Sequence, residues 1–154
     1  MKIQVIRCGK VAHSDLLPLV ADYRKRLQPF CKTEDIEVKV DPMGRDKRAS
    51  SKATPPIYQP RTGDYLIALD ERGPVLSTSL FAKKIQTMTD DPRIKNLIFL
   101  IGPPYGFDET SKKAAHELWS LSPLTIPSDF AWLLAWEQIY RAQTILKGMP
   151  YHHV

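Results

Sequence analysis

Two short runs, YLIAL at residues 65–69 and NLIFLI at residues 96–101, decide the fold class of this chain. Their side chains are apolar at nearly every position, so neither run offers a polar face to water. Strands that are apolar on both faces are typical of a parallel sheet that helices cover on each side. No apolar run in the chain reaches the length of a membrane-spanning helix. We therefore expect an α/β fold with a mostly parallel sheet, and a protein that does not span a membrane.

The remaining elements follow from the periodicity of apolar side chains. Alternation with period two predicts strands, and recurrence every three or four residues predicts helices. The predicted strands are residues 2–8 and 35–40, and the predicted helices are residues 14–28, 77–87, 108–118 and 128–147. Ser14 or Asp15 can cap the first helix, and Gly148 should end the last one. No repeat or linker divides the chain, which predicts one domain over residues 1–154.

Composition limits the class of protein further. The 154 residues are 43% hydrophobic and 25% charged, an ordinary balance for a soluble domain. The chain begins directly on strand-like alternation and lacks the pattern of a signal peptide, which favours a cytoplasmic protein. Cys8 and Cys31 form neither a metal-spaced cluster nor a disulfide framework, so we expect reduced thiols and no metal site. The net charge of +5 permits contact with a polyanion without requiring it.

Positive charge is concentrated in one stretch, residues 42–61. Its basic residues are Arg45, Lys47, Arg48, Lys52 and Arg61. Glycine and prolines interrupt the stretch and no helical or strand period runs through it, so we expect an exposed loop. Contacts to the phosphates of RNA or DNA are one interpretation, and an ordinary solvated connector is the other.

Ligands of parallel α/β sheets bind beyond the carboxyl ends of the strands. The loops after Leu69 and Ile101, and the loop LSPLTIP at residues 121–127, should therefore border a binding site. Pro123 and Pro127 prevent the last loop from forming a plain strand or helix, so its backbone groups need other partners. The edge of an adenine ring is one candidate partner, and a neighbouring chain segment is the alternative. The loop after Ile101 lacks the spacing of phosphate-binding loops, which disfavours a nucleoside triphosphate.

Seven segments, considered together, resemble a known family. They are MKIQVIRCGK at residues 1–10, DYRKRL at 22–27, LIALDERG at 66–73, IFLIGPPYG at 98–106, SLSPLTIP at 120–127, EQIYRA at 137–142 and PYHH at 150–153. The family is that of the small bacterial SPOUT-superfamily methyltransferases, which modify N3 of a pseudouridine in the 23S ribosomal RNA of the large subunit. The resemblance implies an α/β fold with a C-terminal trefoil knot and a homodimer. It further implies S-adenosylmethionine as cofactor, and ribosomal RNA or the assembled ribosome bound across the subunit interface.

Carried over position by position, the resemblance also implies site residues. The cofactor-binding residues would be Leu69, Asp70, Gly102, Pro103, Leu121, Ser122, Pro123, Leu124, Thr125, Ile126 and Pro127. Arg141 falls on the catalytic arginine of the family, and Tyr151 and His152 fall on its substrate-site tail. Because arginine stays protonated, Arg141 would stabilise the developing anion or orient the uracil carbonyls, whereas His152 could relay the N3 proton.

The same residues have simpler interpretations. Arg141 could pair with Glu137 one helical turn away, and a histidine near a chain end is often part of a disordered tail. Trp132 and Trp136 could stack on bases, but aromatic side chains on an apolar helix face more often lie in a core or an interface. We expect these two tryptophans to lie in the dimer interface.

The chain departs from the family pattern near the cofactor site. Pro103 and Tyr105 replace a glycine and an acid, and Ser128 and Trp132 replace a histidine and an arginine. The short basic loop replaces a helix between the second and third strands. These departures define the alternative function, a catalytically silent or substrate-shifted SPOUT paralogue that binds RNA or a protein partner.

Overall fold

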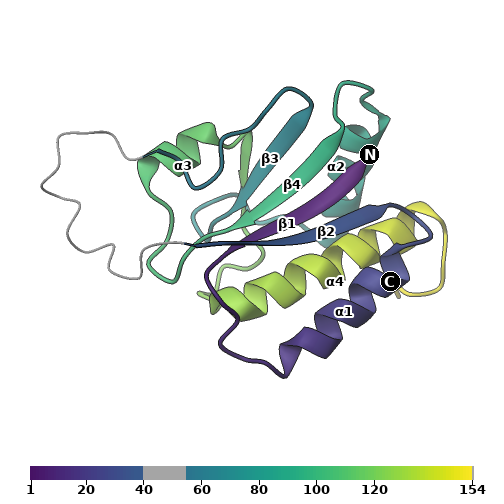
Figure 1. Ribbon diagram of the computed structural model, residues 1–154. Coiled ribbons are helices and arrows are strands. Elements are labelled where there is room, and N and C mark those ends of the chain that lie inside the picture. Colours follow the sequence, from purple (N-terminus) through teal and green to yellow (C-terminus); the bar gives the residue numbers. More distant parts are fainter. Residues whose placement is uncertain (40–54, 154) are drawn as a thin grey trace, which may run out of the picture.

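The computed structural model describes residues 1–39 and 55–153 and contains a five-stranded sheet in which every neighbouring pair is parallel (Figure 1). The strands are β1 (Lys2–Cys8), β2 (Lys32–Val38), β3 (Asp64–Leu69), β4 (Asn96–Ile101) and β5 (Glu117–Trp119). Their order across the sheet is β2-β1-β4-β3-β5, which places β3 and β4 in the interior. The prediction of an α/β fold with a mostly parallel sheet is confirmed.

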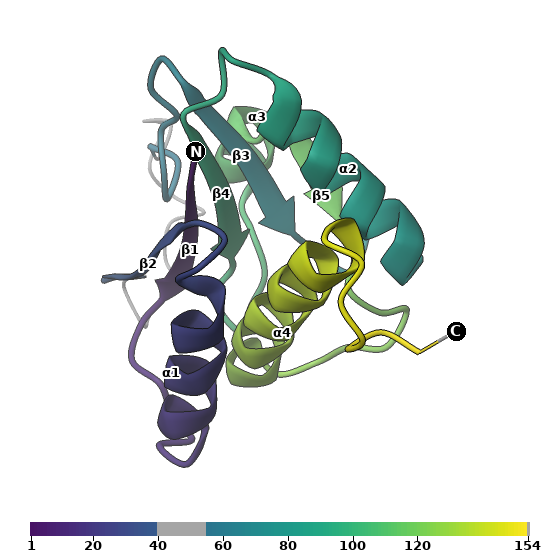
Figure 2. The same cartoon turned by 90° about the vertical axis from the view of Figure 1, so that its right-hand side faces the viewer.

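The described residues form four helices around this sheet. They are α1 (Leu16–Leu27), α2 (Thr78–Asp90), α3 (Glu109–Ala114) and α4 (Ser128–Leu146). Figure 2 shows α4 between α1 and α2 on one side of the sheet, while α3 lies on the other side. Within residues 1–39 and 55–153, no helix is long and apolar enough to cross a membrane.

A buried core occupies each face of the sheet. On the side of α1, α2 and α4, Val5, Leu97 and Phe99 of the strands pack against helix residues such as Phe81 and Ile139. The opposite core is smaller and consists of Ile6, Leu66, Ala68, Ile98, Leu100 and Phe107. Since alternate residues of β3 and β4 enter different cores, both strands are apolar throughout, as the sequence predicts.

The predicted helix at residues 108–118 is wrong in its second half. The chain leaves α3 at Ala115, which has an extended backbone, and residues 117–119 pair with β3 as strand β5. Glu117 accepts hydrogen bonds from the Tyr65 hydroxyl and the Lys84 ammonium group, each at 2.7 Å. Because these partners belong to other elements, tertiary contacts outweigh the local helical pattern here.

Other details of the elements also differ from the predictions. Strand β2 begins at Lys32 rather than at residue 35, because it pairs with β1 along its whole length. Asp15 occupies the N-cap of α1, but its side chain accepts no capping hydrogen bond. The basic residues at 45–52 lie outside the described residues, and Arg61, the last of that group, is exposed.

The expectation that Trp132 and Trp136 lie in a dimer interface is wrong. Both side chains are buried within the chain itself, with exposed fractions of 2% and 0%. Their indole Nε1 groups donate to the same atom, Asp35 Oδ1, at 2.7 and 3.2 Å. The Arg7 guanidinium lies over the Trp132 ring, 5.1 Å from its centre, and its Nε is 3.7 Å from Asp35 Oδ2. The tryptophans therefore attach α4 to β1 and β2 from inside the molecule.

We predict that Asp35→Ala destabilises the fold by about 3 kcal/mol, because it leaves two buried indole donors without their acceptor and removes the carboxylate that faces the Arg7 guanidinium at 3.7 Å. Glu37→Ala is the matched control. Glu37 also pairs with Arg7, at 3.2 Å, but its side chain is 34% exposed against 12% for Asp35. The control should lose less than about 1 kcal/mol. Urea denaturation at fixed protein concentration measures the free energy of unfolding of both variants. Equal losses of stability would contradict the central role of Asp35.

Candidate functional site

A cleft of about 620 Å³ opens beyond the carboxyl ends of the strands. The loops that follow β1, β3, β4 and β5 line it, together with the first residues of α4. All four strands are parallel, so these loops meet at one edge of the sheet. The sequence predicts three of the four loops, and the loop after β1 is the one that it misses.

The residues predicted to bind a cofactor gather in this cleft, with one exception. Those that line it are Leu69, Asp70, Gly102, Pro103, Leu121, Ser122, Leu124, Thr125, Ile126 and Pro127. Pro123 belongs to the same loop but does not line the cleft. Leu69 and Pro127, the first and last residues of the set, lie 58 positions apart in the sequence. The fold therefore brings the predicted set together, and its role in cofactor binding stays a prediction.

The loop at residues 121–127 holds its shape through its own hydroxyl groups. Ser120 Oγ donates to the Ser122 carbonyl at 2.7 Å, and Ser122 Oγ accepts from the Leu124 amide at 3.0 Å. Thr125 Oγ1 donates to Glu71 Oε2 at 2.7 Å, which ties this loop to the loop after β3. Within the described part of the chain, the amides of Leu121, Thr125 and Ile126 donate no hydrogen bond. These three amides are donors that a polar ligand edge can use.

The loop after β4 accommodates its unusual prolines in a tight turn. The Gly106 amide donates to the Pro103 carbonyl at 2.8 Å, and Gly106 has a φ of +86°. Pro104 occupies the second position of this turn, where proline is favoured. A Cβ atom at Gly102 would lie 3.1 Å from the Phe107 ring, so the glycine permits this packing. Ser128 Oγ donates to the Gly102 carbonyl at 3.2 Å, so the residue that replaces the family histidine connects α4 to this loop.

The loop after β1 brings a histidine and an aspartate together at the cleft. Asp129 Oδ2 accepts hydrogen bonds from the amides of Ala12 and His13, each at 2.8 Å, and lies 3.0 Å from His13 Nδ1. All three residues line the cleft. The sequence could have indicated that this loop borders the cleft. Because β1 belongs to the parallel sheet, its carboxyl end must lie at the same edge as the carboxyl ends of β3 and β4.

Cys8 also lines the cleft, but it is a poor candidate nucleophile. Burial raises the pKa of its thiol to about 11. Since the thiolate is the reactive form, a thiol with this pKa stays protonated at neutral pH. The chemistry of the cleft therefore rests on its other side chains.

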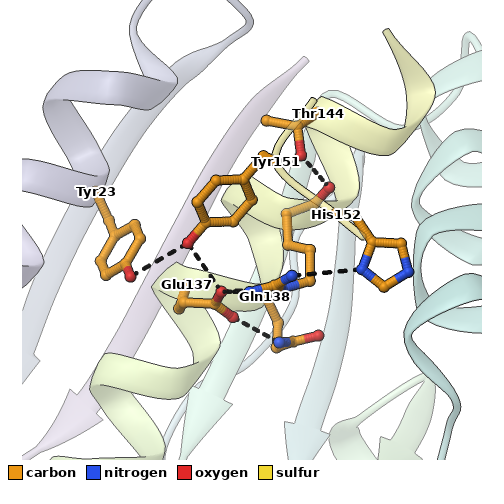
Figure 3. Close-up of polar contacts among 7 residues, drawn as sticks. Tyr23, Glu137, Gln138, Thr144, Tyr151 and His152 are labelled. Carbon is orange, nitrogen blue, oxygen red and sulfur yellow. Dashed lines mark hydrogen bonds and ion pairs between the residues drawn. The ribbon is translucent and has the colours of Figure 1, made fainter. Parts of the chain in front are cut away.

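The predicted catalytic residues form a second cluster, on the C-terminal half of α4. Arg141 Nε donates to Glu137 Oε1 at 3.0 Å, and Arg141 Nη1 lies 3.4 Å from His152 Nδ1. Figure 3 shows the Tyr151 hydroxyl between Tyr23 and Glu137, with His152 turned away from both. The tail is thus packed against the helix as far as His152, and the pairing of Arg141 with Glu137 is confirmed.

This arrangement fixes the charge of Arg141 and the protonation of Tyr151. The hydrogen bond to Glu137 raises the pKa of the Arg141 guanidinium above its usual value. Burial, followed by the hydrogen bond with Tyr23, raises the pKa of the Tyr151 hydroxyl above its usual value. Arg141 can therefore serve as a permanent cation and Tyr151 as a neutral hydrogen-bonding group, but neither can act as a base near pH 7.

Arg141, Tyr151 and His152 do not line the cleft. A smaller hollow of about 160 Å³ lies between the two sites, lined by Leu76, Thr78, Phe81, Ser120, Leu121, Leu134 and Gln138. Ser120 and Leu121 also line the cleft, and Gln138 donates to Glu137 in the cluster. The cleft and the cluster are thus neighbouring sites on one surface.

We predict that Asp129 contributes stability that acid removes. Burial of Asp129 raises its pKa, but the hydrogen bonds from His13 and Ala12 outweigh burial, so that its pKa lies below the usual value of 3.8. A carboxyl group with a lowered pKa stabilises the fold fully above its unfolded-state pKa and ceases to do so as pH falls through its folded-state pKa. The stability advantage of the wild type over Asp129→Asn should therefore shrink as the pH falls below about 4. Urea denaturation midpoints between pH 7 and pH 3 test this, and a constant difference would contradict it.

Comparison with known proteins gives matches along nearly the whole chain. A family model described as "Predicted SPOUT methyltransferase" matches residues 1–152. A protein of Maridesulfovibrio salexigens named ribosomal RNA large subunit methyltransferase H is 35% identical over 158 residues. The protein of the same name from Parabacteroides distasonis is 37% identical over 163 residues. Each comparison covers 99% of this chain and 99% of the relative.

These matches agree with the parallel sheet and with the place of the cleft. The trefoil knot, the homodimer and the roles of individual site residues stay predictions. The family model matches residues 1–152, which is nearly the whole chain, and this chain therefore belongs to the SPOUT methyltransferases.

Proposed function

We propose that the protein is an enzyme that transfers a methyl group from S-adenosylmethionine to N3 of a pseudouridine in large-subunit ribosomal RNA. The observation that carries this proposal is the cleft, which brings together ten of the eleven residues that the sequence assigns to the cofactor. S-adenosylmethionine is the methyl donor of the SPOUT methyltransferases. The names of the relatives support ribosomal RNA of the large subunit as the substrate. We place the activity in the cytoplasm, where this RNA is made and assembled.

The residues of the cleft fit such a donor. A volume of about 620 Å³ lies within the usual range for small-molecule sites. The side chains of Leu69, Leu121 and Ile126 supply apolar surface for a ring, and the amides of the 121–127 loop supply donors at its edge. The carboxylates of Asp70 and Glu71 line the cleft and suit a cationic ligand. When bound, S-adenosylmethionine supplies an electrophilic methyl group on a positively charged sulfur.

Arg141 suits the recognition of a uracil ring that loses its N3 proton. The pair with Glu137 engages Nε and Nη2, while Nη1 points toward His152. A cation held in this orientation can stabilise negative charge on the adjacent carbonyl oxygens of the base. Tyr151 is positioned beside it, because the Arg141 guanidinium lies 4.7 Å from the centre of its ring.

We further propose that the enzyme is a homodimer. Large apolar side chains are exposed near the cleft and the hollow, among them Val75, Leu80, Leu124, Phe130 and Leu134. A second copy of the chain would remove this apolar area from water. As the family resemblance implies, RNA would then bind across the interface.

If the proposed function is correct, the protein binds S-adenosylmethionine. Calorimetric titration with S-adenosylmethionine and S-adenosylhomocysteine should give micromolar dissociation constants, about −8 kcal/mol. Ile126→Asp places a charge against the ring site and should weaken both ligands at least about 100-fold. Lys113→Ala, an exposed change on α3 outside the cleft, is the control and should bind as the wild type does. No detectable heat from the wild type at millimolar ligand would favour the alternative, a catalytically silent paralogue.

The second prediction concerns Arg141. Arg141→Ala should lower the single-turnover rate of methyl transfer to ribosomal particles by about 100- to 1,000-fold, the usual cost of removing a group that stabilises developing charge. Cofactor affinity should change little, because Arg141 does not line the cleft. Arg26→Ala is the matched control, since Arg26 also pairs with an acid one turn away, Asp22, at 2.8 Å. An Arg141→Ala rate equal to that of the control would exclude Arg141 from the mechanism.

A further inference from the structure

We propose that His13, oriented by Asp129, is the general base that removes the N3 proton of the RNA substrate. This inference rests on the proposed function and adds to it a residue from a loop that the sequence did not implicate. The substrate nitrogen must lose a proton during methyl transfer, so the site needs an acceptor close to the reacting atoms. His13 is the only histidine among the residues that line the cleft within the described part of the chain.

The contacts of His13 determine which of its ring nitrogens can accept a proton. Nδ1 lies 3.0 Å from the carboxylate oxygen Oδ2 of Asp129, and a carboxylate can only accept, so Nδ1 carries the hydrogen. Nε2 is then the nitrogen with the lone pair. Within residues 1–39 and 55–153, the hydrogen bonds of the His13 ring involve Nδ1 alone. The Asp129 carboxylate thus fixes the tautomer of the ring, in the way that an aspartate orients a catalytic histidine in hydrolases.

The backbone holds this pair in place. The same oxygen, Asp129 Oδ2, accepts from the amides of Ala12 and His13 at 2.8 Å, so the histidine is attached to α4 at its main chain as well as at its ring. The Phe130 ring lies edge-on to the imidazole, with centroids 5.6 Å apart. The His13 side chain is nevertheless 57% exposed, which leaves room for a nucleotide to approach. A fixed and accessible ring is what a general base requires.

The groups around the cleft place negative charge beside the His13 ring. The charged and titratable groups that share the cleft with it are Asp129 on α4, Lys10 and Cys8 at the end of β1 and its loop, Asp70, Glu71 and Arg72 after β3, and Tyr105 after β4. Three of these are carboxylates and two are cations, and the Asp129 carboxylate lies 3.0 Å from the ring. An imidazolium at His13 would therefore face a compensating negative charge.

His152, the proton relay implied by the family resemblance, has the opposite surroundings. Its Nδ1 lies 3.4 Å from Arg141 Nη1, and a guanidinium can only donate, so this nitrogen is the acceptor of that contact. An imidazolium at His152 would place a second positive charge beside the guanidinium. The contrast between a carboxylate neighbour and a cationic neighbour assigns the base role to His13 and leaves His152 with Arg141 in substrate binding.

With bound S-adenosylmethionine as the methyl donor, the step would balance. The N3–H bond of the pseudouridine breaks, its proton passes to His13 Nε2, and the nitrogen lone pair forms the new bond to the methyl carbon. The carbon–sulfur bond breaks toward sulfur, which neutralises the sulfonium and yields S-adenosylhomocysteine. Asp129 compensates the imidazolium until the proton leaves to water.

Chemical rescue tests this assignment. Single-turnover methyl transfer to ribosomal particles would be measured for the wild type, His13→Ala and His152→Ala, with and without added imidazole. His13→Ala should be slower than the wild type by at least about 100-fold, the usual effect of a general base, and imidazole should restore part of the rate. His152→Ala should gain nothing from imidazole, and neither should the wild type. Rescue of His152→Ala instead, or no loss of rate in His13→Ala, would overturn the assignment.

Cofactor titration separates this inference from folding defects and from the proposed function. His13→Ala and His13→Gln should keep the affinity of the wild type for S-adenosylhomocysteine, and loss of that affinity in both variants would make His13 a binding residue instead of a base. A wild type that methylates RNA while imidazole fails to rescue His13→Ala contradicts this inference alone. A wild type that transfers no methyl group contradicts the proposed function, and the base assignment falls with it.

Discussion

The parallel alignment of the strands is the constraint on which the rest of this structure depends. Parallel pairing of β1, β3, β4 and β5 through the sheet places the carboxyl ends of all four strands at one edge. Every loop that lines the cleft follows one of these strands, or leads into α4 from β5. A strand that ran in the opposite direction would carry its loop to the far edge of the sheet. The direction of the strands therefore determines where the cleft lies, and single side chains have a secondary effect.

Helix α4 connects the parts of the proposed site, and two carboxylates position it. Asp35 accepts from the indoles of Trp132 and Trp136 and so attaches the middle of the helix to β2. Asp129 accepts from the loop after β1 and so fixes the first turn of the helix at the cleft. The far half of the helix carries Arg141 and its partner Glu137. One helix therefore carries both the carboxylate that orients the proposed base and the proposed substrate cation.

The local sequence pattern predicts those elements whose environment shows in adjacent residues. The apolar runs of β3 and β4 and the prolines of the 121–127 loop identify their environments without tertiary information. It failed where contacts between distant residues decide the outcome. Strand β5 forms because Glu117 finds partners on β3 and α2, and the tryptophans of α4 are internal because Asp35 accepts from them. His13 and Asp129 lie 116 residues apart, so no local pattern could have joined them.

Methyl transfer to N3 of a pseudouridine in large-subunit ribosomal RNA is the reaction that we propose for this cleft. The most direct measurement is to incubate the wild type with isotope-labelled S-adenosylmethionine and either purified large-subunit RNA or assembled ribosomes that lack the modification, and then to identify the labelled nucleoside by mass spectrometry. The account predicts a single labelled nucleoside, pseudouridine methylated at N3, from at least one of the two substrates. Label on another nucleoside would show that the enzyme has a different substrate, and no label on either substrate would contradict the account.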